Sequence, residues 1–455
     1  APAEALPVGQ SARPGEPSAM QQSSQLEDLL RAEAGEGMME SSGSFTISGK
    51  KALEKLAAFR LPRETAWVLK IVQAAVASGC SQLDIRQTRS ATEFHFHGET
   101  GWSLAQVEAE FYRVESRSTP SLEHLRQGLW SACLRGMRPF TLTEPNLAEA
   151  LFWTGKQLRR KPVRSQTHTT LTISHRSITD GRRFSLIPDA QGASRNAEVA
   201  RELSAHAYTC CIPLRLDSRR LDNLLASPAH GLSSSTYPIE IGFLPAEVPP
   251  YGLPPGTLKG LPAGQGVDSS LKKLLRPPAN PPSQTGLACL ITAHVRRVGQ
   301  GKVTVWQTYH ERSLVFWVRD GVVVESTALK SATCCSLALF ASAAELGADA
   351  TGFGVVKNSD YYVRLKKLKE SASSFLSQVE LDPGSTIKEA HLKARRIGGA
   401  VMVGGLGLSL ASLPHGLLLV AGGALNLAMA GRKEKEIVEQ IRTGLGTLKQ
   451  EWQCR

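Results

Sequence analysis

Hydrophobic and polar residues are distributed most unevenly near the carboxyl end of the chain. Residues 397–430 include no Lys, Arg, Asp or Glu, and the charged runs KARR and RKEK flank them. One helix of that length would reach about 50 Å, well past the roughly 30 Å hydrocarbon core of a bilayer. Pro414 divides the stretch into two arms of about 16 residues, and basic flanks favour one membrane side for both ends. The pattern predicts a membrane hairpin with both ends cytoplasmic.

Glycine is frequent in both arms of this predicted hairpin. It is costly in a soluble helix, but it lets two membrane helices approach each other closely. A buried hairpin in a soluble core, or the seam of an oligomer, is the alternative for apolar runs this short. The residues predicted to shape the membrane hairpin are Gly398, Gly399, Gly404, Gly405, Gly407, Pro414, Gly416, Gly422 and Gly423.

From about residue 44 the pattern alternates between strand and helix. It predicts a short strand near Ser44, a helix from about Lys50 and a break at Pro62. A long apolar helix follows to about Ser78, with Gly79 as its C-cap, and then another strand. Because this helix has hardly any polar face, it is expected to be buried against a sheet. The segment therefore reads as the opening of an α/β domain.

The helix and the strand after it carry the pattern LxxIVQAAVASGCSQLDI. This pattern resembles the N-box of the GHKL superfamily, the Bergerat-fold ATPases that include gyrase, MutL proteins, histidine kinases and heat-shock chaperone ATPases. In that family Glu, Asn and Asp at i, i+4 and i+7 share one helix face, where they polarise water and hold magnesium. The matching positions here are Lys70, Ala74 and Ala77, with Gln73 on the same stripe. The resemblance implies the fold without a general base or a magnesium ligand.

The next box of the family is Asp-x-Gly-x-Gly, in which the Asp reads the adenine amino group. Residues 92–111 match its strand, glycine turn and helix, but no Asp falls at the adenine position and Glu99 is the only acid nearby. Residues 126–134 are similar to the lid helix, and a strand is expected at 169–174. The resemblance covers about 44–180. It implies a degenerate nucleotide pocket of Lys70, Gln73, Ala74, Ala77, Gly98, Glu99 and Gly101.

The middle of the chain predicts a second domain of the α+β class. Pro and Gly are dense in 245–285, which marks a loop. The runs LACLITAHVRR, KVTVWQTYH and SLVFWVRDGVVVES predict an antiparallel sheet with a turn at Asp320 and Gly321. We expect an apolar helix at 331–346 ended by Gly347, and a basic amphipathic helix at 361–379. The order of elements resembles the transducer modules that follow GHKL domains.

Composition narrows the choice of partners and cofactors. The net charge of +12 and pI near 9.4 favour anionic partners, but the basic clusters lack the interleaved aromatics of a nucleic-acid groove. None of the eight cysteines forms a CxxC pair, which argues against zinc and favours a reducing compartment. His95 and His97 share one strand face, where they could supply two metal ligands, but no nearby Cys or carboxylate spacing completes such a site. A solvated or hydrogen-bonded strand face is therefore expected. Motifs of P-loop enzymes and α/β-hydrolases are absent from the sequence.

Together these patterns predict four segments in an α+β protein. They are a disordered leader (1–43), a degenerate GHKL-like domain (44–215), a second α+β domain (216–385), and the hairpin with a polar helix at 433–453 (386–455). The predicted function is a non-catalytic binding or scaffold protein on the cytoplasmic face of a membrane, with lipid and an unidentified protein as partners and no cofactor. One alternative is a divergent ATPase that binds ATP and magnesium, with Glu99 replacing the lost acid. Another is a soluble homo-oligomer whose seam is the apolar hairpin.

Overall fold

The computed structural model describes residues 61–113, 118–135, 138–155, 157–175, 190–226, 236–258, 282–300, 303–379, 436 and 439–453. All of them belong to one of the chain's two compact units, Gly49–Arg455; the other unit is Ala1–Ser48. The predicted leader, the strand near Ser44, the helix from Lys50 and the whole apolar stretch 397–430 lie outside the described residues. The membrane hairpin and its glycines therefore stay predictions.

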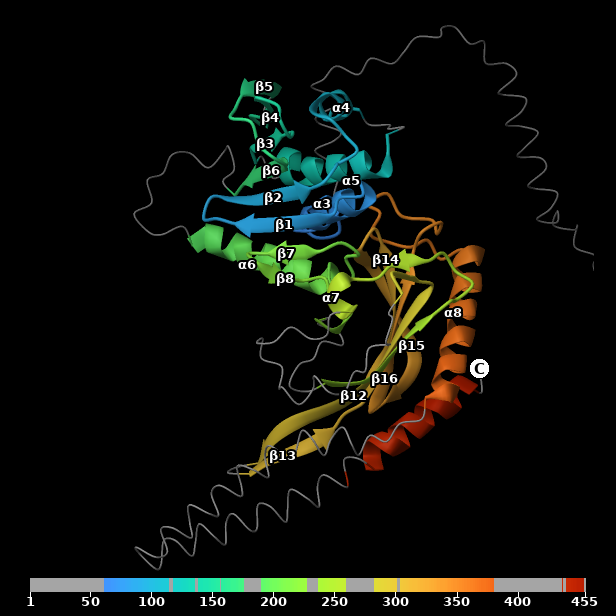
Figure 1. The fold of residues 1–455 in the computed structure, drawn as a ribbon. Helices are drawn as coiled ribbons and strands as arrows, with labels where there is room; N and C mark the ends of the chain where they lie inside the picture. The colour runs from blue at the N-terminus through green and yellow to red at the C-terminus, as the bar shows by residue number, and fades with distance from the viewer. Residues whose placement is uncertain are drawn as a thin grey trace, which may run out of the picture. The chain divides into compact units, whose positions relative to one another are not determined.

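Eight strands form the first sheet, in the order β5-β4-β3-β6-β2-β1-β7-β8 (Figure 1). Neighbouring strands are antiparallel except β1 and β7, which run parallel. The bounds are β1 (Gln82–Gln87), β2 (Ala91–His97), β3 (Phe140–Thr143), β4 (Glu149–Trp153), β5 (Leu158–Pro162), β6 (Thr169–Ser174), β7 (Leu214–Leu216) and β8 (Arg219–Arg220). The strands predicted after Gly79, near residue 92 and at 169–174 are confirmed.

Alternation along these strands gives the sheet one apolar and one polar face. On β2, Phe94 and Phe96 are fully buried, whereas His95 and His97 are half-buried on the opposite face. The antiparallel register places Asp84 of β1 directly opposite His95. The apolar face carries the core of this part of the chain, and the polar face has the histidines.

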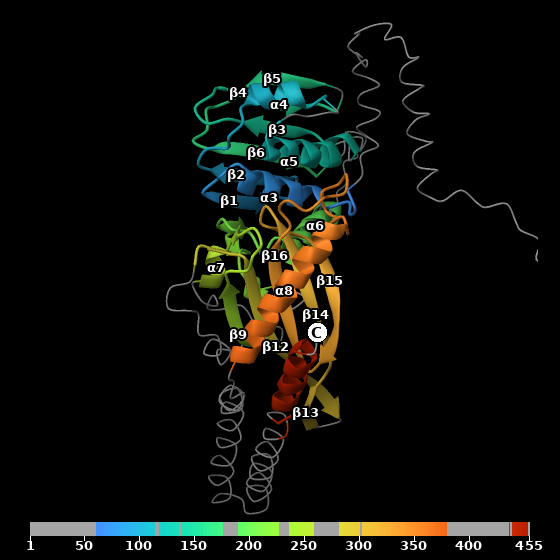
Figure 2. The same ribbon diagram turned by 90° about the vertical axis from the view of Figure 1, so that its right-hand side faces the viewer.

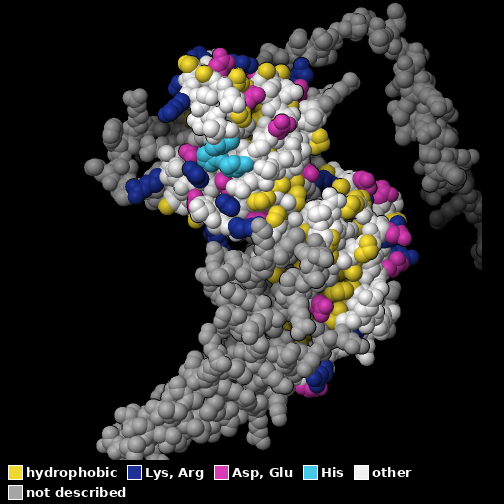
Figure 3. Space-filling view, viewed as in Figure 1, with side chains coloured by type: hydrophobic (Ala, Val, Ile, Leu, Met, Phe, Trp, Pro, Cys, Tyr) yellow, Lys and Arg dark blue, Asp and Glu magenta, His cyan; other side chains and the backbone are white. Residues whose placement is uncertain are grey.

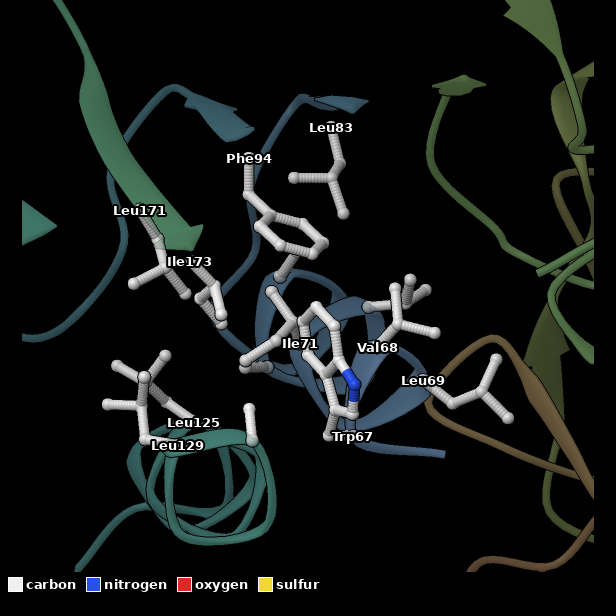
Figure 4. Close-up of a cluster of buried hydrophobic side chains, with 14 of the residues drawn as sticks. Trp67, Val68, Leu69, Ile71, Leu83, Phe94, Leu125, Leu129, Leu171 and Ile173 are labelled. Atoms are coloured by element: carbon white, nitrogen blue, oxygen red, sulfur yellow. The ribbon is translucent and has the colours of Figure 1, made fainter. Parts of the chain in front are cut away.

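Helices pack on the apolar face of the first sheet (Figure 2). The predicted apolar helix is confirmed as α3 (Trp67–Ala77), and Gly79 behind it has the left-handed φ of 80° that a C-cap requires. Figure 4 shows its side chains among those of the sheet and those of Leu125 and Leu129, which belong to helix α5. The other helical elements here are α4 (Leu104–Glu110), α5 (Pro120–Leu129), the π-helix η1 (Trp130–Arg135) and α6 (Ala190–His206).

The second sheet has the strand order β13-β12-β16-β14-β15, and β9 also pairs with β12. β14 and β16 are parallel, and the other pairs are antiparallel. Asp320 and Gly321 have φ of 47° and 75°, so the predicted tight turn between β14 and β15 is confirmed. The bounds are β9 (Thr236–Leu244), β12 (Leu287–Gln300), β13 (Val303–Thr308), β14 (Glu311–Arg319), β15 (Val322–Thr333) and β16 (Cys335–Ser342).

The helix predicted at 331–346 is wrong. That segment holds the end of β15 and all of β16, whose eight residues are all buried between β12 and β14. A strand covered on both faces is continuously apolar, and a short run of this kind has the same pattern as a buried helix. Periodicity alone therefore could not separate the two structures.

Two helical segments pack on the second sheet. The predicted amphipathic helix is confirmed as α8 (Ser359–Gln378), which begins where the Asn358 side chain accepts a hydrogen bond from the Tyr361 amide. Residues 439–453, called here the terminal helix, are also helical and share a core with α8 and the sheet. Within the region predicted as a loop lie β10 (Tyr251–Gly252), α7 (Pro255–Leu258) and β11 (Gln284–Thr285), and η2 (Leu224–Ala226) precedes it. The described residues thus form a mixed α+β fold with two sheets.

Candidate functional site

Helix α3 carries the residues that correspond to the catalytic face of the resembled family. Nine of its eleven residues are buried, among them the polar Lys70 and Gln73. A helix with so little exposed surface is fixed by packing on several sides, so each polar side chain must find its partners inside the protein. The contacts of Lys70 and Gln73 therefore show what this face of α3 binds in this chain.

Lys70 is fully buried, and its ammonium nitrogen lies 4.6 Å from the ring centroid of Phe353, which follows the second sheet in the chain. Nζ has no hydrogen-bond partner among the described residues. Burial, followed by the nearby charge of Arg319, lowers the pKa of Lys70 to about 8, against the opposing effect of neighbouring carboxylates. A cation over an aromatic face is favourable, but a buried ammonium without acceptors is costly. Lys70 therefore joins two parts of the chain at an energetic cost.

The turn between β14 and β15 makes further contacts to the helices of the first sheet. The Gln73 side chain donates to the carbonyl of Arg319 at 3.1 Å. His124 of α5 lies 2.9 Å from the Asp320 carboxylate. The Thr209 hydroxyl donates to the carbonyl of Gly321 at 3.0 Å. Three successive residues at this turn, Arg319, Asp320 and Gly321, are thus held by α3, by α5 and by the segment that follows α6.

Ala74 stands where the resembled family has its magnesium ligand. Its methyl side chain cannot coordinate a cation, and its carbonyl accepts a hydrogen bond from the Ser121 hydroxyl at 2.9 Å. Ser121 in turn accepts from the indole N–H of Trp102 at 3.0 Å. Ala77, one turn further on, is half-buried. The space beside Ala74 is therefore used by a hydrogen-bonded chain from α5 and the segment before α4.

Helix α5 approaches α3 closely at Gly128. A Cβ atom added there would lie 2.7 Å from Ile71 Cδ1 and 3.2 Å from both the Cβ of Lys70 and the carbonyl oxygen of Trp67. Only a glycine permits such an approach without displacement of the neighbouring helix. The two helices are therefore in direct contact along the first turns of α3.

The remaining predicted pocket residues lie at the other end of α3. Gly98, Glu99 and Gly101 are exposed, and both glycines have left-handed φ values of 87° and 66°. A Cβ at Gly101 would be 3.8 Å from the carbonyl oxygen of Ser78, just past the helix. The structure thus places these three residues near the carboxyl end of α3, whereas Lys70 and Gln73 contact the second sheet's turn and the loop beyond.

The predicted hydrogen-bonded histidine face is present on β2, and it has a third member. His95 Nδ1 lies 2.9 Å from His168 Nε2, the His97 ring stacks on His168, and His97 Nε2 lies 3.0 Å from Asp84. Figure 3 shows histidine side chains together on one face. Burial lowers the pKa of His95, with smaller effects from His168 and the charge of Arg86. In the described ranges no group of three or more His, Cys, Asp or Glu is arranged to hold a metal ion.

Sequence reasoning missed His168 because it lies some 70 residues from His95 in the chain. Only the pairing of β2 with β6 brings the two together. It likewise missed Phe353, Arg319 and Asp320 as partners of the α3 residues. A buried lysine in an otherwise apolar helix was the one available signal that a distant partner existed.

No protein family and no curated protein matches this chain. Among solved structures it is similar to the N-terminal domain of a DNA repair protein, at 9% identity and a TM-score of 0.36 over 72% of this chain and 97% of that one. It is also similar to the B-subunit of DNA gyrase from Myxococcus xanthus, at 9% identity, TM-score 0.34, and 72% and 90% coverage. The ATPase domain of the mismatch repair endonuclease MutL from Aquifex aeolicus is similar at 11% identity, TM-score 0.29, and 67% and 97% coverage. MutL and gyrase are both members of the superfamily that the sequence resembles.

Among the helices of the described ranges, none is both long and apolar enough to cross a bilayer. The predicted hairpin at 397–430 is not among these helices, since it lies outside the described residues.

Proposed function

We propose that this chain is a non-catalytic, GHKL-like binding or scaffold protein. The observation that carries the proposal is the residue at position 70. The resembled family has a carboxylate there that polarises water, whereas this chain has a buried lysine that contacts Phe353. General-base catalysis of hydrolysis needs a group that accepts a proton in its resting state. A lysine whose pKa is about 8 is mostly protonated at neutral pH and cannot perform this step efficiently.

Packing around Ala74 supports the same conclusion. A magnesium ion needs oxygen ligands from the protein in addition to phosphate oxygens. Position 74 supplies a methyl group, and its carbonyl is already hydrogen-bonded to Ser121. The close approach of α5 at Gly128 leaves the first turns of α3 in contact with side chains. The face that would bind nucleotide in the resembled family serves as packing surface here.

A scaffold function is supported by contacts that join the first sheet's helices to the second sheet's turn. Gln73, His124 and Thr209 each form a direct hydrogen bond with a different residue at that turn. An ATPase that works by lid closure needs parts that separate and close in each cycle. Three such contacts favour a fixed arrangement, which suits a protein that presents a constant surface to a partner.

Phosphate release by the full chain tests the catalytic part of the proposal. With ATP and magnesium we expect no turnover above a protein-free blank, and none that changes in Glu99→Gln. Glu247→Gln, which alters an acid that is 85% exposed on its side chain, serves as the matched control. Turnover that is lost in Glu99→Gln and kept in Glu247→Gln would establish the ATPase alternative, with Glu99 as the replacement acid.

We further propose that residues 397–430 tether the protein to a membrane as a hairpin. The support comes from the described residues on either side. Lys449 of the terminal helix donates to the carbonyl of Val379 at 2.6 Å, and Ser373 of α8 donates to the carbonyl of Trp452 at 3.1 Å. The chain therefore leaves and rejoins the same folded core, which favours equal sidedness of the two flanks. A single span would put the flanks on opposite sides.

The tether is tested with the full chain in cells. We expect the protein to stay with membranes after carbonate extraction, and cysteines introduced at Lys388 and Lys435 to be labelled from the cytoplasmic side only. Labelling from opposite sides would exclude the hairpin. Extraction of the full chain by carbonate would exclude the tether and favour the oligomer seam.

A further inference from the structure

The terminal helix docks on the second sheet through a pair of adjacent cysteines. Cys334 Sγ donates to the carbonyl of Gln440 at 3.3 Å, and Cys335 Sγ donates to that of Ile441 at 3.5 Å. Cys334 is 6% exposed and Cys335 is fully buried. Both thiols thus face the first turn of the docked helix.

The fit between the helix and Cys334 leaves no room for another atom. A Cβ added to Gly444 would lie 2.3 Å from Cys334 Sγ, far below the contact distance of carbon and sulfur. Apolar side chains on both sides of this contact are buried, including Ile441, Leu445 and Leu448. The helix therefore cannot move away from the sulfur locally while the rest of it stays docked.

Chemical modification of Cys334 would place several atoms where even one methyl group does not fit. Conversely, the docked helix covers the thiol, so a reagent reaches it only when the helix lifts. Because modification of Cys334 and docking of the terminal helix exclude each other, each disfavours the other by the same free energy. Lifting of a terminal helix is the kind of local opening that costs less than global unfolding.

We propose that Cys334 is a site of mixed-disulfide formation with small disulfides of the glutathione type, and that its adduct holds the terminal helix off the second sheet. The Cys334 thiolate attacks one sulfur of the small disulfide, and a new S–S bond forms as the old one breaks. The second sulfur leaves as a thiolate and takes up the proton that Cys334 gave up, so the reagent is reduced by the thiol it modifies. Interaction with the adjacent Cys335 thiol lowers the pKa of Cys334, whereas the pKa of Cys335 is raised, so Cys334 is the better nucleophile of the pair.

An adduct on Cys334 would change how the segment between α8 and the terminal helix is attached. When the helix is docked, both ends of that segment are held by the second sheet and α8. When Cys334 carries an adduct, only the end at Val379 remains attached. Thiol chemistry thus controls how the carboxyl end of the chain is held, independently of whether residues 397–430 enter a membrane.

Two glycines of the terminal helix provide a matched pair of variants. A Cβ at Gly446 meets nothing within 4 Å, whereas one at Gly444 meets Cys334 Sγ. Both Gly→Ala changes raise helix propensity equally, so their difference isolates the contact. With glutathione disulfide as the probe, Gly444→Ala should raise the initial rate of adduct formation at Cys334 by about tenfold, as expected for an overpacked contact that favours the open helix. Gly446→Ala should leave that rate within about twofold of the parent chain.

Mass spectrometry of the full chain measures these rates, with the half-buried Cys211 as the internal reference. Hydrogen exchange of residues 439–453 measures docking. We expect the Cys334 adduct to raise exchange there, and Cys334→Ala to restore slow exchange to the Gly444→Ala chain. The proposal is overturned if the adduct leaves exchange of 439–453 unchanged, or if Gly444→Ala and Gly446→Ala react at the same rate.

Discussion

Replacement of Lys70 by methionine should stabilise the protein near neutral pH. Methionine has a similar length and flexibility, and its sulfur makes favourable contacts with an aromatic ring such as Phe353. The change removes a fully buried ammonium that has no hydrogen-bond partner among the described residues. The substitution therefore tests directly whether the buried ammonium of Lys70 lowers the stability of the fold.

The magnitude follows from the pKa of Lys70, which burial lowers from 10.5 to about 8. Such a difference corresponds to about 3 kcal/mol of penalty for the charged form. Contact with the Phe353 ring is worth up to about 2 kcal/mol to the cation, and methionine recovers part of that. We expect the unfolding free energy of Lys70→Met to exceed that of the parent chain by about 1 to 2 kcal/mol at pH 7.

The pH dependence provides a second signature. Between pH 8 and 10.5 the unfolded chain binds more protons at Lys70 than the native chain does, so parent stability rises with pH in this window. The advantage of Lys70→Met should therefore be largest below pH 8 and decrease steadily as the pH rises to 10.5. Other alkaline titrations are shared by both chains and cancel in the difference.

Urea unfolding followed by tryptophan fluorescence measures this difference across the pH range. Lys366→Met, at a lysine that is 79% exposed on its side chain, is the control and should change stability by less than about 0.5 kcal/mol. If Lys70→Met destabilises the chain at pH 7, or if its effect does not vary between pH 8 and 10.5, favourable interactions of the Lys70 ammonium outweigh the cost of its burial.

Changes at three further positions test particular parts of the structure. Gly128→Ala should cost about 1 to 3 kcal/mol in urea unfolding because its Cβ would meet Ile71 at 2.7 Å; a neutral result would show that α3 and α5 can separate freely. Burial lowers the pKa of His294 to about 4, so the unfolded state binds more protons between pH 6.5 and 4, and unfolding free energy should fall there by up to about 3 kcal/mol. His294→Gln should flatten that acid limb, and an unchanged limb would assign it to other groups. Asp320→Val should destabilise by about 1 to 2 kcal/mol through its left-handed φ and the lost His124 contact, while Asp320→Asn should cost less.

Local sequence patterns were sufficient to predict helix α3 and the turn that contacts it. The apolar length of α3, its C-cap at Gly79 and the turn at Asp320 and Gly321 depend on neighbours in sequence. The segment around Cys335 could not, because a strand buried on both faces and a buried helix share one apolar pattern. Its identity is decided by β12 and β14, which lie elsewhere in the chain.

The candidate site divides in the same way. The absence of Glu, Asn and Asp from positions 70, 74 and 77, respectively, is visible in the sequence. The new partner of Lys70 is Phe353, about 280 residues away, and no local pattern connects the two. The contact of His95 with His168 depends on strand pairing in the same manner. Long-range contacts of this kind decide which partners a buried polar side chain has.

Calorimetric titration of the full chain with ATP and magnesium tests the central claim most directly. Because Lys70 is occupied by its contact with Phe353 and Ala74 offers no ligand, we predict no saturable heat of binding at nucleotide concentrations up to the millimolar range. Saturable binding with a micromolar Kd, weakened in a Gly101→Val chain, would contradict the account and restore a functional nucleotide pocket.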